Sequence, residues 1–353
     1  MGRAIYVSSV NGDDANSGYA PEKAFRSLKK VNQMEIQPGD QILLERGSVF
    51  VGEYLHLYRG GTKEAPVVVD AYGEGALPRI ETDGNGIWYQ NYGGHLDNVV
   101  HTWKGYLSSA VLLYDAEYIS IRNLEITNNP CVKNERLNQA DRMNRTGVSV
   151  IAKNHGTLHE IELDHLYIHD VEGNIYDKHL NNGGIYMSVS RPDDEEKTGI
   201  ARYDGIHIHH CKVENCRRWG IAAGYTYQHD KFTTLELPDE VVKTYGSTNV
   251  VIEHNFVKDI GGDGITPMYC FEPLIQYNVS ENIAVDIHPD LYNEEGNRGG
   301  MTAAAILSMY VFLFSLLTPL SIRIRSASTV VRRSSHRTTS SPVLRSSASL
   351  KAS

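Results

Sequence analysis

The sequence predicts an all-β fold, a right-handed parallel β-helix in which short strands stack coil upon coil. Three features support this: apolar strands with period-two alternation recur along the chain, a polar corner follows each of them, and a glycine begins the next strand. A β-sandwich of similar strands is the alternative, but it needs hairpin turns at regular spacing, and the chain shows few of them. The pattern therefore favours a solenoid.

Residues 1–79 are expected to form an N-terminal cap and the first strands. Phe25, Leu28 and Val31 recur every third residue with basic residues between them, which predicts a short amphipathic helix. Residues 41–45 and 67–72 are apolar and read as strands. A helix placed before the first full coil would cover the open end of a solenoid, which otherwise exposes unpaired backbone groups.

Residues 80–305 carry the repeats and are expected to form the parallel β-helix. Similar strand–corner–strand units occur at 118–126, 161–168, 206–213, 250–257 and 273–279. Polar residues at or beside these corners, which can stack in a ladder, are Asn123, Asp164, His210, Asn255 and Asn278. A further strand then begins with a glycine, at Gly147, Gly184, Gly220 and Gly264. Insertions between these elements are expected to build the binding face.

The charge and the cysteine content argue against some classes of function. The chain of 353 residues has a formal net charge of −9, and all charged residues after Met301 are basic, so the body of the chain is acidic. An acidic body argues against nucleic acid as a partner, because phosphate binding needs clustered Lys and Arg. The four cysteines fit no metal template, and Cys211 and Cys216 are interpreted as a structural thiol pair that approaches across a turn.

The N-terminal run and the repeats together carry a family resemblance. The run extends from Tyr6-Val7-Ser8 through Asn11-Gly12-Asp13-Asp14 to Pro38-Gly39-Asp40. Over about residues 4–300 the chain resembles secreted bacterial right-handed β-helix proteins of the pectin-lyase-like superfamily. This resemblance implies a carbohydrate-active protein that acts on a polysaccharide or oligosaccharide, outside the cell or on its surface, although no secretory signal precedes the first strand. The superfamily holds lyases, hydrolases and non-enzymatic surface proteins, so fold alone leaves the reaction open.

Residues 306–353 differ in composition from the repeats. The stretch 299–322 has no charged residue and is long enough for a transmembrane helix, and a Ser- and Arg-rich segment follows it. One interpretation is a membrane anchor with a basic flank, which is the only way in which a membrane would be a partner. The other is a shifted reading frame, because the repeat pattern stops mid-coil near Ala305.

Two reactions suit a carbohydrate-active β-helix. Hydrolysis needs two carboxylates, about 5–5.5 Å apart for retention or about 6.5–9.5 Å for inversion. Elimination from a uronic acid needs a base and a cation that neutralises the substrate carboxylate, so Ca²⁺ is expected only if the protein is a lyase. No other cofactor is indicated, and no residue is assigned to a metal.

The glycine-flanked Asp263 is the first candidate for an acid or nucleophile. Glycines on both sides are expected to let the backbone turn sharply and present the carboxylate on a groove; a plain corner turn is the alternative. The possible second carboxylates are Glu214, Asp230 and Asp259, and the candidate bases for elimination are His229 and Lys258.

Aromatic residues near this cluster are candidate sugar platforms. Tyrosine is common (21) and phenylalanine rare (7), and a tyrosine ring can stay half-exposed with its hydroxyl bonded. The rings expected to line a glycan groove are Trp219, Tyr225, Tyr227 and Tyr269. The alternative is that tyrosine simply suits exposed strand positions.

The function that the sequence favours is degradation of plant-type or uronate-containing glycans, with a hydrolase slightly ahead of a lyase. A non-enzymatic glycan-binding or adhesion β-helix is the second hypothesis. An inactive truncated fragment is the third, because a shifted frame would remove coils.

Overall fold

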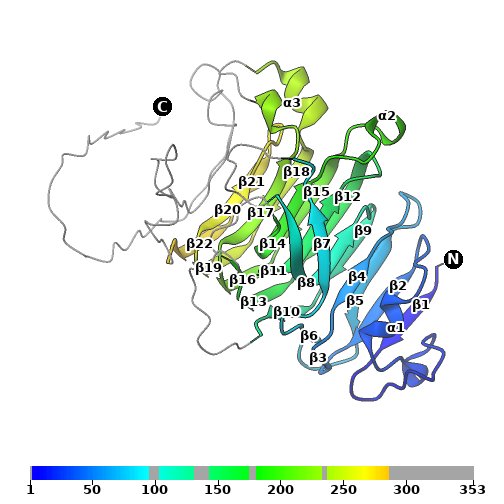
Figure 1. Cartoon of the computed structure of the whole chain (residues 1–353). Coiled ribbons are helices and arrows are strands. Elements are labelled where there is room, and N and C mark those ends of the chain that lie inside the picture. Colours follow the sequence, from blue (N-terminus) through cyan, green and yellow to red (C-terminus); the bar gives the residue numbers. More distant parts are fainter. Residues whose placement is uncertain (1, 95–102, 131–142, 175–179, 233–236, 286–353) are drawn as a thin grey trace, which may run out of the picture.

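The computed structural model describes residues 2–94, 103–130, 143–174, 180–232 and 237–285. Figure 1 shows three parallel sheets that advance coil by coil from the N-terminus, coloured blue, to the last described strands, coloured yellow. Every pair of neighbouring strands within the three sheets runs parallel, apart from one antiparallel hairpin. The predicted parallel β-helix is confirmed.

Each sheet takes one strand from each coil. Sheet A contains β1 (Ala4–Val7), β2 (Gln41–Glu45), β5 (Val67–Tyr72), β9 (Ile119–Arg122), β12 (Thr157–Asp164), β15 (Arg202–His209), β18 (Thr248–Glu253) and β21 (Leu274–Gln276). Sheet B contains β3 (Val49–Val51), β6 (Arg79–Glu81), β10 (Glu125–Asn128), β13 (Tyr167–Val171), β16 (Lys212–Cys216), β19 (Phe256–Ile260) and β22 (Val279–Ile283). Sheet C contains β4 (Leu55–Leu57), β8 (Lys104–Tyr114), β11 (Asn144–Ala152), β14 (Gly183–Val189), β17 (Trp219–Thr226) and β20 (Asp263–Pro267), and β7 (Ile87–Asn91) pairs with β8.

The coils begin earlier than residue 80. Strands β1 and β2 already pair in register in sheet A, and β6 spans the predicted boundary. The predicted helix is α1 (Leu28–Asn32), whose Leu28 and Val31 are buried. The Asn32 side chain donates to the Tyr54 carbonyl over 2.8 Å and accepts from the His56 amide over 2.8 Å, so α1 lies against β4, the first strand of sheet C. The cap is therefore confirmed, but it is part of the first coils.

The remaining helical elements of the described residues lie in segments that connect strands. They are α2 (Glu195–Thr198), α3 (Asp239–Tyr245) and two 3₁₀ turns at Pro21–Lys23 and His229–Phe232. Asp194 caps α2 by accepting from the Lys197 amide. Among the described residues, no helix combines the length and apolarity that crossing a bilayer requires. The predicted apolar stretch 299–322 and the tail 306–353 lie outside the described residues.

The core is built from columns of equivalent apolar residues. Ile119, Ile161 and Ile206 stand side by side in sheet A, and each is at most 2% exposed. Repeated apolar strands therefore bury one another, as the period-two alternation predicts. The described cysteines, Cys211, Cys216 and Cys270, are buried and free, so the first two form no disulfide, and burial raises the pKa of their thiols.

At the corner between sheets A and B, one residue in each of five successive coils has a left-handed backbone conformation, and these residues form a column. Its residues have φ between 49° and 57° and are Asn123, His165, His210, His254 and Tyr277. Neighbouring rings stack at 4.8 Å (His165 on His210), 5.1 Å (His210 on His254) and 4.8 Å (His254 on Tyr277). We call these five residues the ring ladder. Asn255 and Asn278, which were predicted in a corner ladder, stand one residue later.

The glycines that begin the sheet C strands are needed for close packing. A Cβ on Gly184 would lie 2.7 Å from the Gly220 carbonyl oxygen and 2.5 Å from Val213 Cγ1. A Cβ on Gly220 would lie 2.4 Å from the Gly264 oxygen. The predicted glycines therefore form a column that lets successive coils approach.

Candidate functional site

The outer face of sheet C is covered by the hairpin of β7 and β8. Residues of β7 alternate between exposed and buried, with Trp88 and Gln90 turned inward. The Trp88 indole donates to Ser109 Oγ over 2.8 Å, and the Gln90 amide donates to Ser188 Oγ over 3.2 Å. The hairpin is therefore a flap that lies on the sheet.

A buried polar cluster lies under the flap. Thr146 Oγ1 lies 2.7 Å from Ser109 Oγ and 2.8 Å from Ser149 Oγ. The ring of His56 lies 2.9 Å from the Ser109 carbonyl oxygen. Burial lowers the pKa of His56 to about 4, so this imidazole is neutral at neutral pH.

Asp263 begins β20 at the far edge of the same sheet. It is paired in register with Trp219 of β17, and both residues are buried. The Arg218 guanidinium lies over the Trp219 ring, 4.4 Å from its centroid. Asp263 and Trp219 therefore stand at equivalent heights in successive coils.

The glycine before Asp263 serves a different purpose from the predicted one. Neither Gly261 nor Gly262 has a positive φ. A Cβ on Gly262 would lie 2.1 Å from the Arg218 carbonyl oxygen and 3.1 Å from its Nη1. The predicted turn between β19 and β20 is present, because the chain bends at Gly261 and Gly262. Glycine is required there by the close approach of Arg218 rather than by a left-handed backbone.

Two buried polar atoms near Asp263 have no hydrogen-bond partner among the described residues. They are Trp219 Nε1 and Thr266 Oγ1. Thr266 alternates with the core residue Ile265, so it faces outward from sheet C. A buried donor without a partner is costly, and a ligand rich in hydroxyl groups could satisfy both atoms.

Three of the predicted partners of Asp263 lie on another sheet. Glu214 stands opposite Lys258 in sheet B, where it pairs with Lys212 over 2.8 Å. Lys258 pairs with Glu281 over 3.4 Å. The side chain of Asp259, whose φ is 53°, accepts from Asn282 one coil on. Because the polar residues of sheet B turn away from the core, the predicted pairing of these groups with Asp263 is wrong.

Asp230 and His229 lie at the opposite end of sheet C. Both belong to the 3₁₀ turn that follows β17, whereas Asp263 stands beside the first residue of that strand. The strand from Trp219 to Thr226 spans about 23 Å at about 3.3 Å per residue. That distance exceeds the separation of about 6.5–9.5 Å in an inverting pair, so the structure does not bring these residues together with Asp263.

The predicted sugar platforms are buried. Trp219, Tyr225, Tyr227 and Tyr269 are each at most 4% exposed, so the expected half-exposed rings are wrong. Tyr225 packs on Tyr92 at 5.5 Å and on Tyr269 at 5.7 Å, and Tyr227 donates to Glu195 over 2.6 Å. For Tyr225 the physical reason is Tyr92, which directly follows β7 and packs on its ring.

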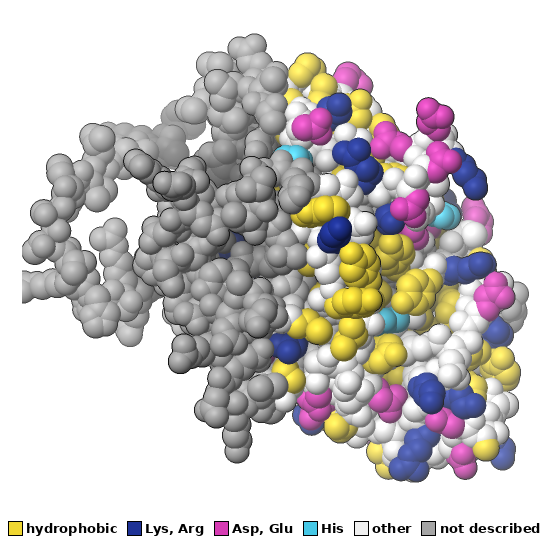
Figure 2. Space-filling model, viewed as in Figure 1, with side chains coloured by type: hydrophobic (Ala, Val, Ile, Leu, Met, Phe, Trp, Pro, Cys, Tyr) yellow, Lys and Arg dark blue, Asp and Glu magenta, His cyan; other side chains and the backbone are white. Residues whose placement is uncertain are grey.

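Exposed aromatic residues instead lie on the flap and beside it. Figure 2 shows hydrophobic side chains gathered over the middle of this face, above β4, β7 and β8. The exposed tyrosines are Tyr89 (47%) in β7, Tyr106 (67%) in β8 and Tyr58 (57%) directly after β4, and we call them the tyrosine platform. The rings of Tyr89 and Tyr106 meet edge to face at 5.1 Å. The signal in the sequence is the alternation of residues 87–91, which is typical of a half-buried strand.

A groove of about 590 Å³ lies on sheet A beside α3. Polar residues from β15, β18 and α3 line it, among them Arg202, Asp204, Lys243 and Thr248. None of the predicted site residues belongs to this groove, so the predicted chemistry and the groove are separate features.

Comparisons with known proteins give one group of close relatives, while no family model matches the chain. It is 39% identical over 341 residues to a lacto-N-biosidase of Bifidobacterium longum subsp. longum, across 86% of this chain and 21% of that protein. Two crystal structures of a GH136 lacto-N-biosidase from Eubacterium ramulus are 52% and 51% identical, with TM-scores of 0.82 and 0.81.

This chain matches only part of the length of each of these relatives. The Eubacterium ramulus structures match 88% and 87% of this chain but only 50% and 49% of their own. The chain thus spans about half of those structures and about a fifth of the Bifidobacterium protein. Its three parallel sheets and these matches establish that the chain is a parallel β-helix protein with the fold of the GH136 lacto-N-biosidase structures.

Proposed function

We propose that this chain supplies the β-helix of a glycoside hydrolase of the lacto-N-biosidase type, acting on glycans that carry lacto-N-biose. The observation that carries the proposal is the 52% identity to the GH136 lacto-N-biosidase across 88% of this chain. Identity at this level over most of this chain goes with shared site chemistry far more often than fold similarity alone does. A substrate with plant-type sugars or uronic acids is the alternative from the resemblance.

The outer face of sheet C supports a glycan site. Asp263 is a buried carboxylate in register with Trp219, whose ring lies 4.4 Å from the Arg218 guanidinium, and a positioned carboxyl group is a common general acid or base. The unpartnered Trp219 Nε1 and Thr266 Oγ1 fit the hydroxyl groups of a sugar. The tyrosine platform adds exposed rings on which sugar faces can stack.

The test is release of lacto-N-biose from a p-nitrophenyl lacto-N-bioside, alongside absorbance of unsaturated products from polygalacturonate and alginate. Release of the disaccharide without unsaturated products supports the hydrolase. Unsaturated products would overturn it in favour of a lyase. Tight binding of lacto-N-biose without turnover would favour the glycan-binding alternative. Neither binding nor turnover by a folded protein would overturn the proposal.

Asp263→Asn tests the assignment of the carboxylate. The amide has the same shape but cannot transfer a proton, so kcat should fall by about 10²-fold or more while lacto-N-biose still binds. Asp259→Asn in the same coil is the matched control, because its neighbours in the sheet B column, Asn215 and Asn282, are already asparagines with positive φ. Equal activity of the two variants would remove Asp263 from the mechanism.

The tyrosine platform is tested separately from the chemistry. Tyr89→Ala and Tyr106→Ala should raise KM with little change in kcat, because a ring that stacks on a sugar binds ground and transition states alike. Tyr19→Ala is the control, since Tyr19 is 51% exposed but lies in the N-terminal turns. An unchanged KM in both platform variants would place the glycan elsewhere.

A further inference from the structure

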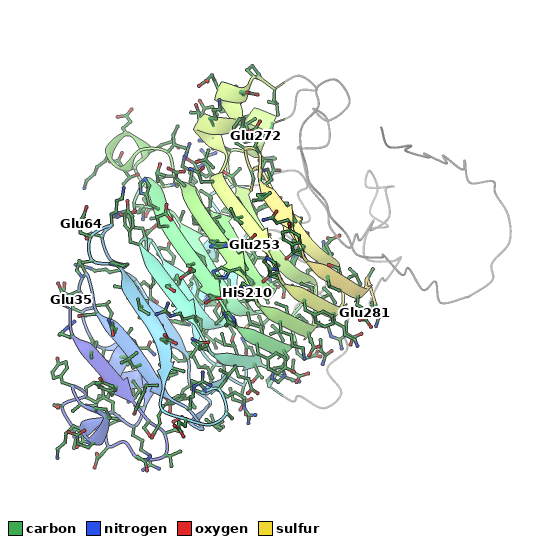
Figure 3. The ribbon with its side chains drawn as sticks, turned by 180° about the vertical axis from the view of Figure 1, so that it is seen from behind. Glu35, Glu64, His210, Glu253, Glu272 and Glu281 are labelled. Carbon is green, nitrogen blue, oxygen red and sulfur yellow. The ribbon has the colours of Figure 1, made fainter. Side chains whose placement is uncertain are left out.

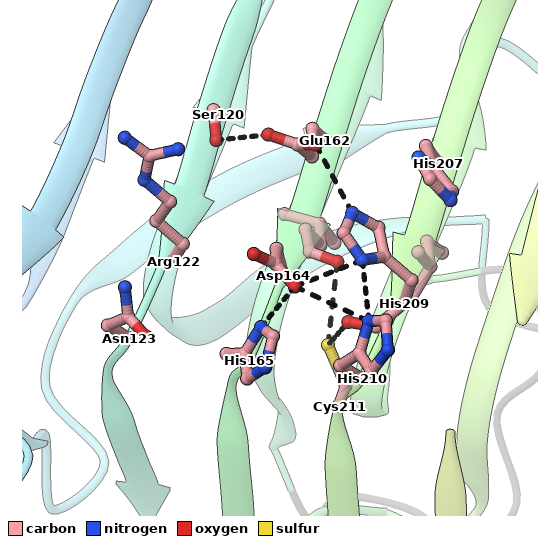
Figure 4. A network of polar contacts seen from close by, with 12 residues as sticks. Ser120, Arg122, Asn123, Glu162, Asp164, His165, His207, His209, His210 and Cys211 are labelled. Atoms are coloured by element: carbon pink, nitrogen blue, oxygen red, sulfur yellow. Dashed lines mark hydrogen bonds and ion pairs between the residues drawn. The ribbon is translucent and has the colours of Figure 1, made fainter. Parts of the chain in front are cut away.

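Histidines and acids gather on the outer face of sheet A, on the side of the molecule away from the flap. Figure 3 shows His210 and Glu253 on this face, viewed from behind relative to Figure 1. Figure 4 shows the cluster around Asp164 at the end of β12 and His209 at the end of β15. These strands are neighbours in sheet A, so the cluster joins two successive coils. None of its residues belongs to the proposed glycan site.

The ligand-type atoms of this cluster converge on Asp164. Its Oδ1 lies 2.5 Å from His165 Nδ1, 3.0 Å from His209 Nδ1 and 3.9 Å from His210 Nδ1. The two histidine atoms His209 Nδ1 and His210 Nδ1 are 2.9 Å apart. Tetrahedral ligands at about 2.0–2.1 Å from an ion stand about 3.3 Å from one another. The four separations given above range from 2.5 to 3.9 Å, so they lie on both sides of that value.

We propose that Asp164, His165 and His210, together with Nδ1 of His209, form a binding site for a divalent transition-metal ion such as Zn²⁺. Three imidazole nitrogens and one carboxylate oxygen suit Zn²⁺, Co²⁺ or Ni²⁺, whereas Ca²⁺ and Mg²⁺ prefer all-oxygen sites. One ligand atom from each of Asp164, His165 and His210 lies within 4.8 Å of the other two, which is close enough for all three to bind one ion.

The surrounding residues hold the ligands in place. His209 Nε2 lies 3.2 Å from Glu162 Oε1, and Ser120 donates to the other oxygen of Glu162 over 2.6 Å. A carboxylate on the far nitrogen of a ligating histidine fixes the orientation of its ring and raises its basicity. The rings of His165 and His210 are parallel within 8°, because both belong to the ring ladder. Little side-chain rearrangement is therefore needed for binding.

The site is reachable from solvent. The side chains of His165 and His210 are 57% and 47% exposed, while those of Asp164 and His209 are 16% and 13% exposed. An ion there would link β12 to β15 and thereby clamp two coils together. Because the unfolded chain has no such site, bound metal should raise the stability of the folded protein.

A second group of ligand-type residues also includes His209. Glu162, His207 and His209 also have ligand atoms within 4.8 Å of one another. His207, however, lies 3.1 Å from Glu253, which draws its Nε2 toward the next coil. We therefore place the ion at Asp164, and His207→Asn separates the two locations.

The test is Zn²⁺ titration of EDTA-treated full-length protein by calorimetry, with Co²⁺ absorbance as a report of coordination geometry. Asp164→Asn and the double variant His165→Asn/His210→Asn should each weaken Zn²⁺ binding more than tenfold and abolish the increase in Tm on adding Zn²⁺. Asparagine tolerates positive φ and already occupies the ladder at Asn123, so the double variant should fold.

His254→Asn is the matched control. It removes a ring from the same ladder, stacked 5.1 Å from His210, but His254 is not among the converging ligands. Its Zn²⁺ affinity should equal that of the wild type. The proposal is overturned if the wild type binds no Zn²⁺, if the double variant binds as the wild type does, or if only His207→Asn loses binding.

Discussion

Asn255 illustrates how one side chain holds a corner of the helix. It is 2% exposed, accepts from the Cys211 amide over 2.9 Å and donates to the Ile208 carbonyl over 2.9 Å. It also contacts Asn278 of the following coil, which repeats the same arrangement. Its amide therefore satisfies backbone groups that the bend leaves without a ladder partner.

Asn255→Ala should destabilise the protein by about 2–4 kcal/mol, because a buried N–H and a buried C=O both lose their partner. The measurement is the free energy of unfolding in urea. Asn154→Ala, at an exposed turn, should change it by less than about 1 kcal/mol. A loss at Asn255 no larger than in that control would contradict the role of the side chain.

His56 should make stability depend on pH. Its pKa is lowered to about 4 in the folded protein against an ordinary value of 6.5, so between these values only the unfolded chain takes up the proton. Stability is therefore complete above pH 6.5 and falls as pH drops toward 4, by on the order of 2 kcal/mol at pH 5. His56→Gln should unfold with a smaller difference between pH 7.5 and pH 5; an unchanged difference would assign the effect to other groups.

At the residue scale, the sequence repeat indicates that Asp263 and Trp219 are neighbours, but it does not reveal which side chains bury the residues around them. Asp263 and Trp219 begin equivalent strands, so the repeat alone places them side by side. The burial of Tyr225 could not be inferred, because the side chain that covers it, Tyr92, comes from a segment far away in the sequence. Local patterns determine which residues share a column but not which insertion covers them.

At the scale of elements, the glycine column determines how closely coils stack. A Cβ on Gly220 would contact the next coil's backbone at 2.4 Å and Val257 Cγ1 at 2.6 Å. Both are closer than real contacts allow, and neither neighbour is the flexible end of a long side chain. The strands of sheet C can therefore keep their spacing only with glycine at this position.

Gly220→Ala should cost about 1–3 kcal/mol, as overpacking of a close-packed core usually does. The expected result is a Tm lower by several degrees, measured by circular dichroism. An unchanged Tm would show that the coils separate easily at this point, contrary to the tight packing described.

The repeat strands were predictable and the flap was not. Units at 118–126, 161–168 and 206–213 share one pattern, and self-similarity reveals them without any structure. The flap strand Ile87–Asn91 occurs once and pairs antiparallel with β8, so no repeat indicates it. Because the flap covers sheet C, the site predictions that depended on an open face were wrong.

At the scale of the whole molecule, each coil rests mainly on its two neighbours. Strands pair with those one coil away, so stability is close to a sum over coils and interfaces. In the described part of the chain the last strands are β20, β21 and β22, and Leu274 and Val279 are 38% and 44% exposed there.

The ring ladder also defines a unit of length for this protein. Because His165 and His210 hold equivalent positions in successive coils, joining Asp164 directly to His210 would remove one whole turn of the solenoid and leave every remaining rung in register. A deletion that stops between rungs would instead shift inward-facing residues to the outside. The molecule can thus change its length by complete turns, while the insertions on sheet C can vary without changing that period.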